Sequence, residues 1–103
     1  MMSFGRYTTP TIVLTFEEEG LDLTTAANVY VTFASGSTRL TKTGEELQVA
    51  PKQISVLLTQ AETGRFGKSV DVQANWTGNG GVRYQSDIQE IPVDRNLLER
   101  VVE

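Results

Sequence analysis

Hydrophobic and polar residues alternate through most of the chain, with the period of two that is typical of β-strands buried on one face. Residues 28–34 show the pattern most clearly, because Val29, Val31 and Phe33 share one face. Tyr30 lies on the opposite, polar face of the same stretch. The alternation recurs in four further stretches, at residues 12–16, 54–58, 70–76 and 82–88. Each of these predicted strands needs a hydrophobic core on one side.

Glycine-containing turns separate the predicted strands at short intervals, at residues 35–37, 43–46 and 77–81. Gly and Asn adopt the positive φ that tight hairpin connections require. The turns therefore predict two hairpins, which join 28–34 to 38–42 and 69–76 to 82–90. Residues 38–42 contain Leu40 as their only apolar residue, between charged neighbours, and this indicates an edge strand protected by charge.

Two segments interrupt the alternation. In residues 59–64, a Thr and a Glu stand at the spacing of a capping box, and a Gly follows. This pattern predicts one helical turn that crosses from one sheet to the other. Between Ile88 and Ile91 the apolar positions shift by one residue, which predicts a β-bulge near Gln89 or Glu90.

About seven short strands in roughly 100 residues, with one short helical turn, predict an all-β fold. We expect a two-sheet antiparallel sandwich of immunoglobulin-like architecture. We expect the chain to comprise a flexible N-terminal arm (1–9), a β-sandwich domain (10–93) and a short C-terminal helical tail (94–103). Six residues are expected in the core: Leu14, Val31, Phe33, Val56, Val72 and Trp76.

The two ends of the chain are the predicted contact regions. Residues 94–103 carry apolar side chains at spacings that one helical face would collect into a stripe. So short a helix does not persist unaided in water, so the stripe packs either on its own sandwich or on a neighbouring protein. Pro10 suits the start of an edge strand, and Arg6 to Thr9 form either an arm that lies across a neighbour or a frayed terminus. The candidate partner contacts are Arg6, Tyr7, Tyr30, Leu97, Leu98, Val101 and Val102.

The composition excludes several classes of chemistry. The 103 residues contain no His and no Cys, so the commonest general base, the usual transition-metal ligand and the thiolate zinc site are missing. Nine basic and thirteen acidic residues give a net charge of -4 without a basic cluster, so nucleic acid is not an expected partner. No run approaches the roughly 20 apolar residues of a membrane span, and no signal peptide is evident. We expect a cytoplasmic protein at synthesis that is not an enzyme and binds no cofactor or metal.

Two side-chain groups suggest binding sites. Residues 17–22 gather four carboxylates, which are the ligands that calcium prefers. Their spacing matches no calcium loop, so a solvated acidic loop and a weak cation site are both open. Four aromatic residues are candidates for a platform that stacks on sugar rings: Tyr7, Tyr30, Trp76 and Tyr84. Trp76 shares the apolar face of Val70 and Val72, which is more typical of a core residue.

Three motifs occur in a fixed order along the first two thirds of the chain. An Arg-x-Thr-Thr-Pro opening occupies residues 6–10, a Lys-Thr-Gly turn 42–44, and a Leu-Thr-Gln-x-x-Thr-x-x-Phe stretch 58–66. This succession resembles a family of small proteins encoded among the tail and structural genes of prophages in Gram-positive bacteria. Residues 21–37 are also similar to the N-terminal β-sandwich of phage baseplate upper proteins.

The resemblance implies a non-enzymatic structural or assembly protein of a phage or prophage tail or baseplate. It implies synthesis in the host cytoplasm followed by association with the virion, and it supplies no catalytic residues. The expected partners are other tail or baseplate proteins, or further copies of the chain in a homo-oligomer. The alternative function, from another class, is a carbohydrate or cell-surface binding β-sandwich module.

Overall fold

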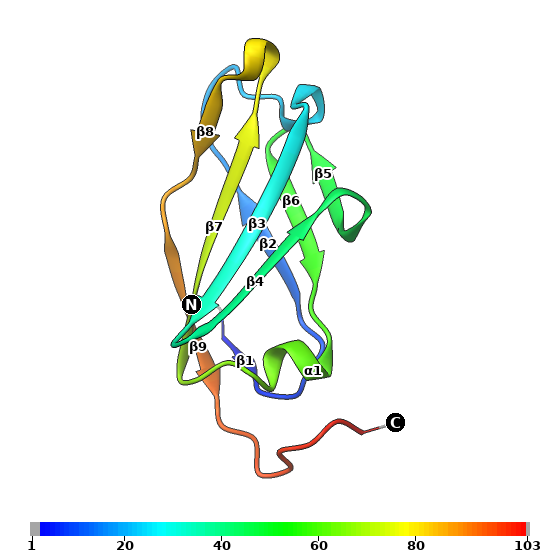
Figure 1. Ribbon diagram of the computed structural model, residues 1–103, viewed down its shortest axis with the longest axis vertical. Coiled ribbons are helices and arrows are strands. Elements are labelled where there is room, and N and C mark those ends of the chain that lie inside the picture. Colours follow the sequence, from blue (N-terminus) through cyan, green and yellow to red (C-terminus); the bar gives the residue numbers. More distant parts are fainter. Residues whose placement is uncertain (1–2, 103) are drawn as a thin grey trace.

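A computed structural model describes residues 3–102 of the chain, and within them two β-sheets pack face to face (Figure 1). The larger sheet has six strands in the order β1-β9-β7-β3-β4, with β8 also paired to β7, and the smaller sheet has the order β2-β6-β5. The larger sheet contains β1 (Phe4–Gly5), β3 (Asn28–Ser35), β4 (Thr38–Thr43), β7 (Ser69–Thr77), β8 (Arg83–Gln85) and β9 (Gln89–Asp94). The smaller sheet contains β2 (Thr11–Thr15), β5 (Leu47–Ala50) and β6 (Gln53–Leu57). Two facing sheets with no long helix confirm the predicted all-β, two-sheet fold.

The core lies where the inward faces of the two sheets meet. All six residues predicted for it are buried, from Val31 and Phe33 at 0% exposure to Trp76 at 7%. Removing these apolar side chains from water is the main favourable contribution to folding. The alternation of the sequence therefore places the core correctly in β2, β3, β6 and β7.

The connections between the strands follow the turn chemistry. The predicted hairpin of β3 and β4 is present, and β4 lies at the edge of the larger sheet as expected. Short 3-10 turns occupy other connections: η1 (Leu23–Thr25), η2 (Gly44–Glu46) and η3 (Asn79–Gly81). The predicted helical turn is α1 (Gln60–Thr63), which links β6 of the smaller sheet to β7 of the larger one. Its capping box is formed, with Thr59 and Glu62 each accepting the other's backbone N–H at 3.2 and 2.8 Å.

Strands β8 and β9 are two halves of one strand, separated at residues 86–88. Both pair with β7, with Trp76 opposite Tyr84 in the first half and Val70 opposite Ile91 in the second. The paired residue numbers sum to 160 and 161, so the second half is displaced by one residue, as a bulge requires. The predicted bulge is present, slightly before the predicted position.

The expectation that residues 82–88 turn an apolar face to the core is wrong. Val82, Tyr84 and Ile88 are 51%, 49% and 63% exposed. The reason is local: β8 is only three residues long, and Ile88 lies in the interruption, where it pairs with no strand.

The N-terminal segment is not the flexible arm expected for residues 1–9. Phe4 is 7% exposed and belongs to β1, which pairs in parallel with β9. Its ring packs edge-on against Phe66, with 6.2 Å between ring centroids. The Thr63 hydroxyl then donates to the carbonyl of Thr8 at 2.8 Å. A large apolar side chain and a parallel pairing therefore join the segment to the sandwich, and residues 1 and 2 lie outside the described range.

The C-terminal tail is not helical. Residues 95–102 contain no helix or strand, and β9 extends the sandwich to Asp94, one residue beyond the expected boundary. An isolated helix of this length is unstable, and here the backbone of the tail is held by side chains of the sandwich instead. Residue 103 lies outside the described range.

Candidate functional site

The lower end of the sandwich in Figure 1 is formed by the N-terminal segment, α1 and the tail of residues 95–102, which passes below α1. The side-chain amide of Asn96 donates to the carbonyl of Arg6 at 2.8 Å. Further along, the side chain of Gln60 makes two hydrogen bonds with the backbone of Val102, one to its carbonyl and one from its N–H, each 2.8 Å long. Polar contacts therefore tie the tail to the sandwich at both ends, through the side chain of Asn96 and the main chain of Val102.

Arg6 and Tyr7, two of the predicted contact residues, help to build this end of the molecule. The Arg6 guanidinium donates to the carbonyl of Gly64 at 2.7 Å and forms an ion pair with Glu99 of the tail. Tyr7 adopts a φ of 60°, which is uncommon for a residue other than Gly. Its ring lies against Gly64, where an added Cβ would come within 2.4 Å of the ring. Both side chains are half-buried and hold α1 and the tail in place.

Four further predicted contacts form the tail strip, which we define as Leu97, Leu98, Val101 and Val102. Leu97 is 87% exposed and Val101 54%, while Val102, beside Gln60, is 38% exposed. Single exposed apolar residues are common on protein surfaces. Four within six consecutive residues, on a backbone fixed by hydrogen bonds, make a preformed apolar surface of the kind that marks interaction sites.

Tyr30, the seventh predicted contact, lies apart from the tail strip. It is 38% exposed and lines a groove of about 380 Å³ with residues of β4, β7 and β8. The Arg83 side chain borders the groove and donates two hydrogen bonds to the Asn75 side-chain oxygen, at 3.1 and 3.3 Å. The structure therefore brings six of the seven predicted contacts to one end and leaves Tyr30 near the other.

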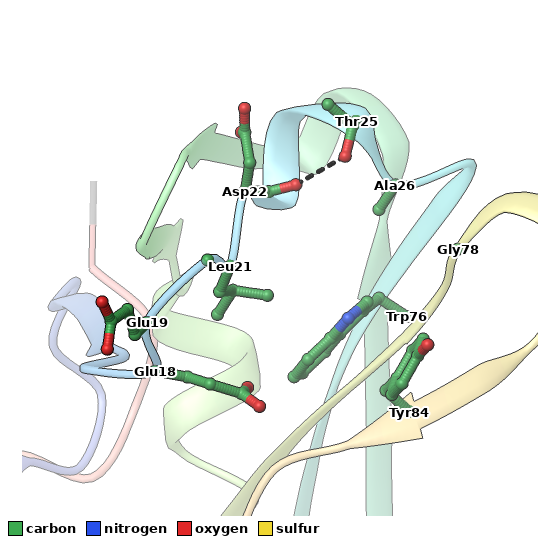
Figure 2. Close-up of a pocket in the computed structure, with 10 residues that line it drawn as sticks. Glu18, Glu19, Leu21, Asp22, Thr25, Ala26, Trp76, Gly78 and Tyr84 are labelled. Carbon is green, nitrogen blue, oxygen red and sulfur yellow. Dashed lines mark hydrogen bonds between the residues drawn. The ribbon is translucent and has the colours of Figure 1, made fainter.

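A second cavity, of about 270 Å³, lies between the acidic loop and two of the aromatic residues (Figure 2). Tyr84 stacks on Trp76 with 6.1 Å between ring centroids and 21° between the planes. Trp76 is almost wholly buried and also packs edge-on against Phe16. Its role as a core residue is confirmed, and Tyr84 is the exposed member of the pair.

The carboxylates of the acidic loop do not converge on this cavity. In Figure 2 the side chain of Glu18 points toward the cavity, whereas those of Glu19 and Asp22 point away from it. The Asp22 carboxylate is occupied in capping η1, where it accepts the N–H of Thr24 at 3.0 Å. Within residues 3–102 no three His, Cys, Asp or Glu side chains lie where they could hold a metal ion. The loop can offer single carboxylates to a ligand.

Sequence reasoning missed one charged site. Lys42 of β4 shares the inward face of Leu40, and its ammonium lies 2.6 Å from Glu62 and 3.7 Å from Glu46. Burial raises the pKa of Glu62. Hydrogen bonds from Lys42 and Thr59, together with the positive charge of Lys42, lower this pKa by more than burial raises it, so the pKa of Glu62 lies below its ordinary value. The period of two in residues 38–42 already placed Lys42 on the same face as Leu40, and this signal was available in the sequence.

Comparison of the chain with protein-family models, with curated proteins and with solved structures gives no significant match. In the described range no helix has the length and apolar character that a membrane span needs.

Proposed function

We propose that the chain is a non-enzymatic structural or assembly protein of a phage or prophage tail or baseplate, which attaches to another tail protein through the tail strip. The observation that carries the proposal is the exposure of this apolar surface on a backbone that is already fixed. Because the backbone is ordered before contact, binding does not have to offset an entropy loss from ordering it.

Two of the motifs that resemble the prophage family contribute residues to the end of the molecule that carries the tail strip. Arg6 comes from the first motif and Gln60 from the third, and these two residues contact the tail directly. Thr63, also from the third motif, ties α1 to the N-terminal segment. Two of the residues on which the resemblance rests, Arg6 and Gln60, thus hold the tail.

The proposal is tested by mass spectrometry of purified particles induced from a strain that carries the gene. The chain should be present, and V101D should remove it from the particles because a charge in the contact surface opposes desolvation. V82D is the matched control, because Val82 is nearly as exposed as Val101 but directly precedes β8, the strand labelled near the upper end of Figure 1. Absence of the unaltered chain from particles, or equal incorporation of both variants, contradicts the proposal.

A carbohydrate or cell-surface binding module is the second candidate. The observation that favours it is the pair of Trp76 and Tyr84 beside an open cavity that also contains the Glu18 side chain. Aromatic faces stack on sugar rings, and carboxylates accept hydrogen bonds from sugar hydroxyl groups. In a glycan-array measurement, Y84A should abolish binding while V101D leaves it unchanged. No glycan binding by the unaltered chain would dismiss this candidate.

A further inference from the structure

Strand β2 is an open edge of the smaller sheet. It pairs with β6 on one side, and in the described part of the chain no strand pairs with it on the other. The pairing with β6 continues at both ends of β2: Leu58 N–H donates to the Pro10 carbonyl at 3.0 Å, and Phe16 N–H donates to the Lys52 carbonyl at 2.8 Å. In an antiparallel pair every second residue turns its N–H and C=O to the partner strand. The even-numbered residues of β2 therefore face β6.

The odd-numbered residues turn their backbone groups to the open side. These residues are Thr11, Val13 and Thr15. Their side chains lie on the outer face of the smaller sheet, since Ile12 and Leu14 fill the core. Three N–H and three C=O groups thus stand in a row along an uncharged strand that contains no Gly, Pro or bulge. Such an edge is a template for pairing with another strand.

The other long free edge is protected. In β4 the inward-facing Lys42 is held by Glu62 and Glu46, and an inward charge is a known device against edge pairing. Strand β5 has four residues and is followed directly by Pro51. The contrast points to β2 as the edge left open for assembly.

The sequence of β2 fits a second copy of itself. An antiparallel pair with its two-fold axis at Val13 places Val13 opposite Val13, and Thr11 opposite Thr15 of the other copy. All outward N–H groups then find a carbonyl, three from each copy and six hydrogen bonds in all. Thr–Thr and β-branched pairs across strands are favourable.

Charge fixes the direction of the pairing. Three acidic residues, Glu17, Glu18 and Glu19, follow β2 after Phe16. Antiparallel pairing places the acidic stretches of the two copies at opposite ends of the paired strands, whereas parallel pairing would place them side by side. Adjacent carboxylates repel each other, so the antiparallel arrangement is favoured.

We propose that two copies of the chain associate through β2, antiparallel about Val13, so that the two smaller sheets become one continuous six-stranded sheet. The pair is isologous, because the same edge is used by both copies. This inference uses none of the residues of the tail strip and does not rest on the proposed function.

The first test needs no variant. Light scattering on the full chain over a range of concentrations should show the mass rising to that of two copies. Hydrogen exchange should then show the amides of Thr11, Val13 and Thr15 protected at least tenfold more in the dimer than at low concentration. The amides of Ile12 and Leu14 should be protected in both states, because they already face β6. A monomer at every concentration, or a dimer without this alternating protection, overturns the proposal.

The second test places a charge on the two-fold axis. V13K and V13E should each be monomeric, because two like charges would meet across the axis. An equimolar mixture of the two should recover the dimer, since the charges are then opposite. S55K is the matched control, since Ser55 is the neighbour of Val13 on the inner strand β6, and it should leave the dimer intact. Circular dichroism on each variant checks that it is folded, and a V13K protein that still dimerises overturns the proposal.

Discussion

Replacing Glu62 by Gln tests whether the charge pair between β4 and α1 stabilises the sandwich. The ammonium of Lys42 lies 2.6 Å from the Glu62 carboxylate, and only 10% of the Lys42 side chain is exposed. Glu46, at 3.7 Å, is the second partner of Lys42. Gln keeps the size of Glu62 and the oxygen that accepts the Thr59 N–H in the capping box. The substitution therefore removes the negative charge and little else.

The expected cost follows from the burial of the pair. Exposed ion pairs contribute about 0–1 kcal/mol, and removing one partner of a fully buried pair costs about 3–5 kcal/mol. The Lys42 and Glu62 side chains are 10% and 18% exposed, which lies between these limits, and Glu46 remains to compensate Lys42. We expect E62Q to lower the free energy of unfolding by about 1–2 kcal/mol at neutral pH, a substantial part of the roughly 5–15 kcal/mol that a small domain has.

The pH dependence separates this charge effect from a packing effect. Burial raises the pKa of Glu62, but the contacts with Lys42 and Thr59 lower it by a larger amount. Folding therefore depresses the pKa of Glu62 below its ordinary value of 4.5. A group of this kind contributes stability that is complete above its unfolded-state pKa and is lost as the pH falls through its folded-state pKa. The difference in stability between the wild type and E62Q should therefore be constant near neutral pH and shrink below pH 4.5.

Urea unfolding followed by the fluorescence of Trp76 measures the difference, at pH 7 and at steps down to pH 3. The matched control is E45Q, because Glu45 is an exposed carboxylate beside Glu46. Surface substitutions of this kind change stability by about 0.5 kcal/mol or less. An E62Q protein as stable as the wild type at pH 7, or a difference of unchanged size at pH 3, would refute the reasoning.

Three further predictions concern the core, the lower end and the tail. V72D buries an unpaired charge at a position that is 1% exposed, so it should cost several kcal/mol or abolish folding; an unchanged melting temperature in calorimetry would contradict the core assignment. G64A places a Cβ 2.4 Å from the Tyr7 ring, so it should destabilise the chain by about 1–3 kcal/mol, and G64A combined with Y7A should recover most of the loss in thermal melts. A chain ending at Asp94 loses the Gln60 hydrogen bonds and the Glu99 ion pair. It should remain folded and melt about 4–8 °C lower, the change expected for about 1 kcal/mol, and an equal melting temperature would show that these contacts do not stabilise the sandwich.

The fold could be predicted from the sequence because the residue pattern within each main strand determines which of its faces is buried. In residues 28–34 and 70–76 the alternation determines which side chains face inward, and two such faces can be buried only against each other. The capping box at Thr59 and Glu62 is also local, and it predicted α1 correctly. These features are determined by residues that are close together in the sequence, so the sequence alone is enough to predict them.

The features that were missed depend on contacts between distant residues. Phe4 reaches the core only because β1 pairs with β9, at the far end of the chain. The helical periodicity of residues 94–103 is real as a pattern, yet the hydrogen bonds of Val102 to Gln60 determine the conformation. Six predicted contacts do meet at one end, but Arg6 and Tyr7 serve there as supports of the tail. A short segment takes its structure from whatever it packs against, and the sequence does not state what that is.

The two proposed surfaces can be separated experimentally, because they share no residue and use different physics. The β2 edge uses backbone hydrogen bonds, which V13K opposes by placing like charges on the two-fold axis, whereas the tail strip uses apolar side chains, which V101D makes costly to desolvate. Substitutions without shared partners have effects that add. V13K should therefore give a monomer that still enters particles. V101D should give a dimer that is absent from particles. If V101D also prevented dimerisation in light scattering, the tail strip would belong to the same interface as β2, and the independence of the two surfaces would be wrong.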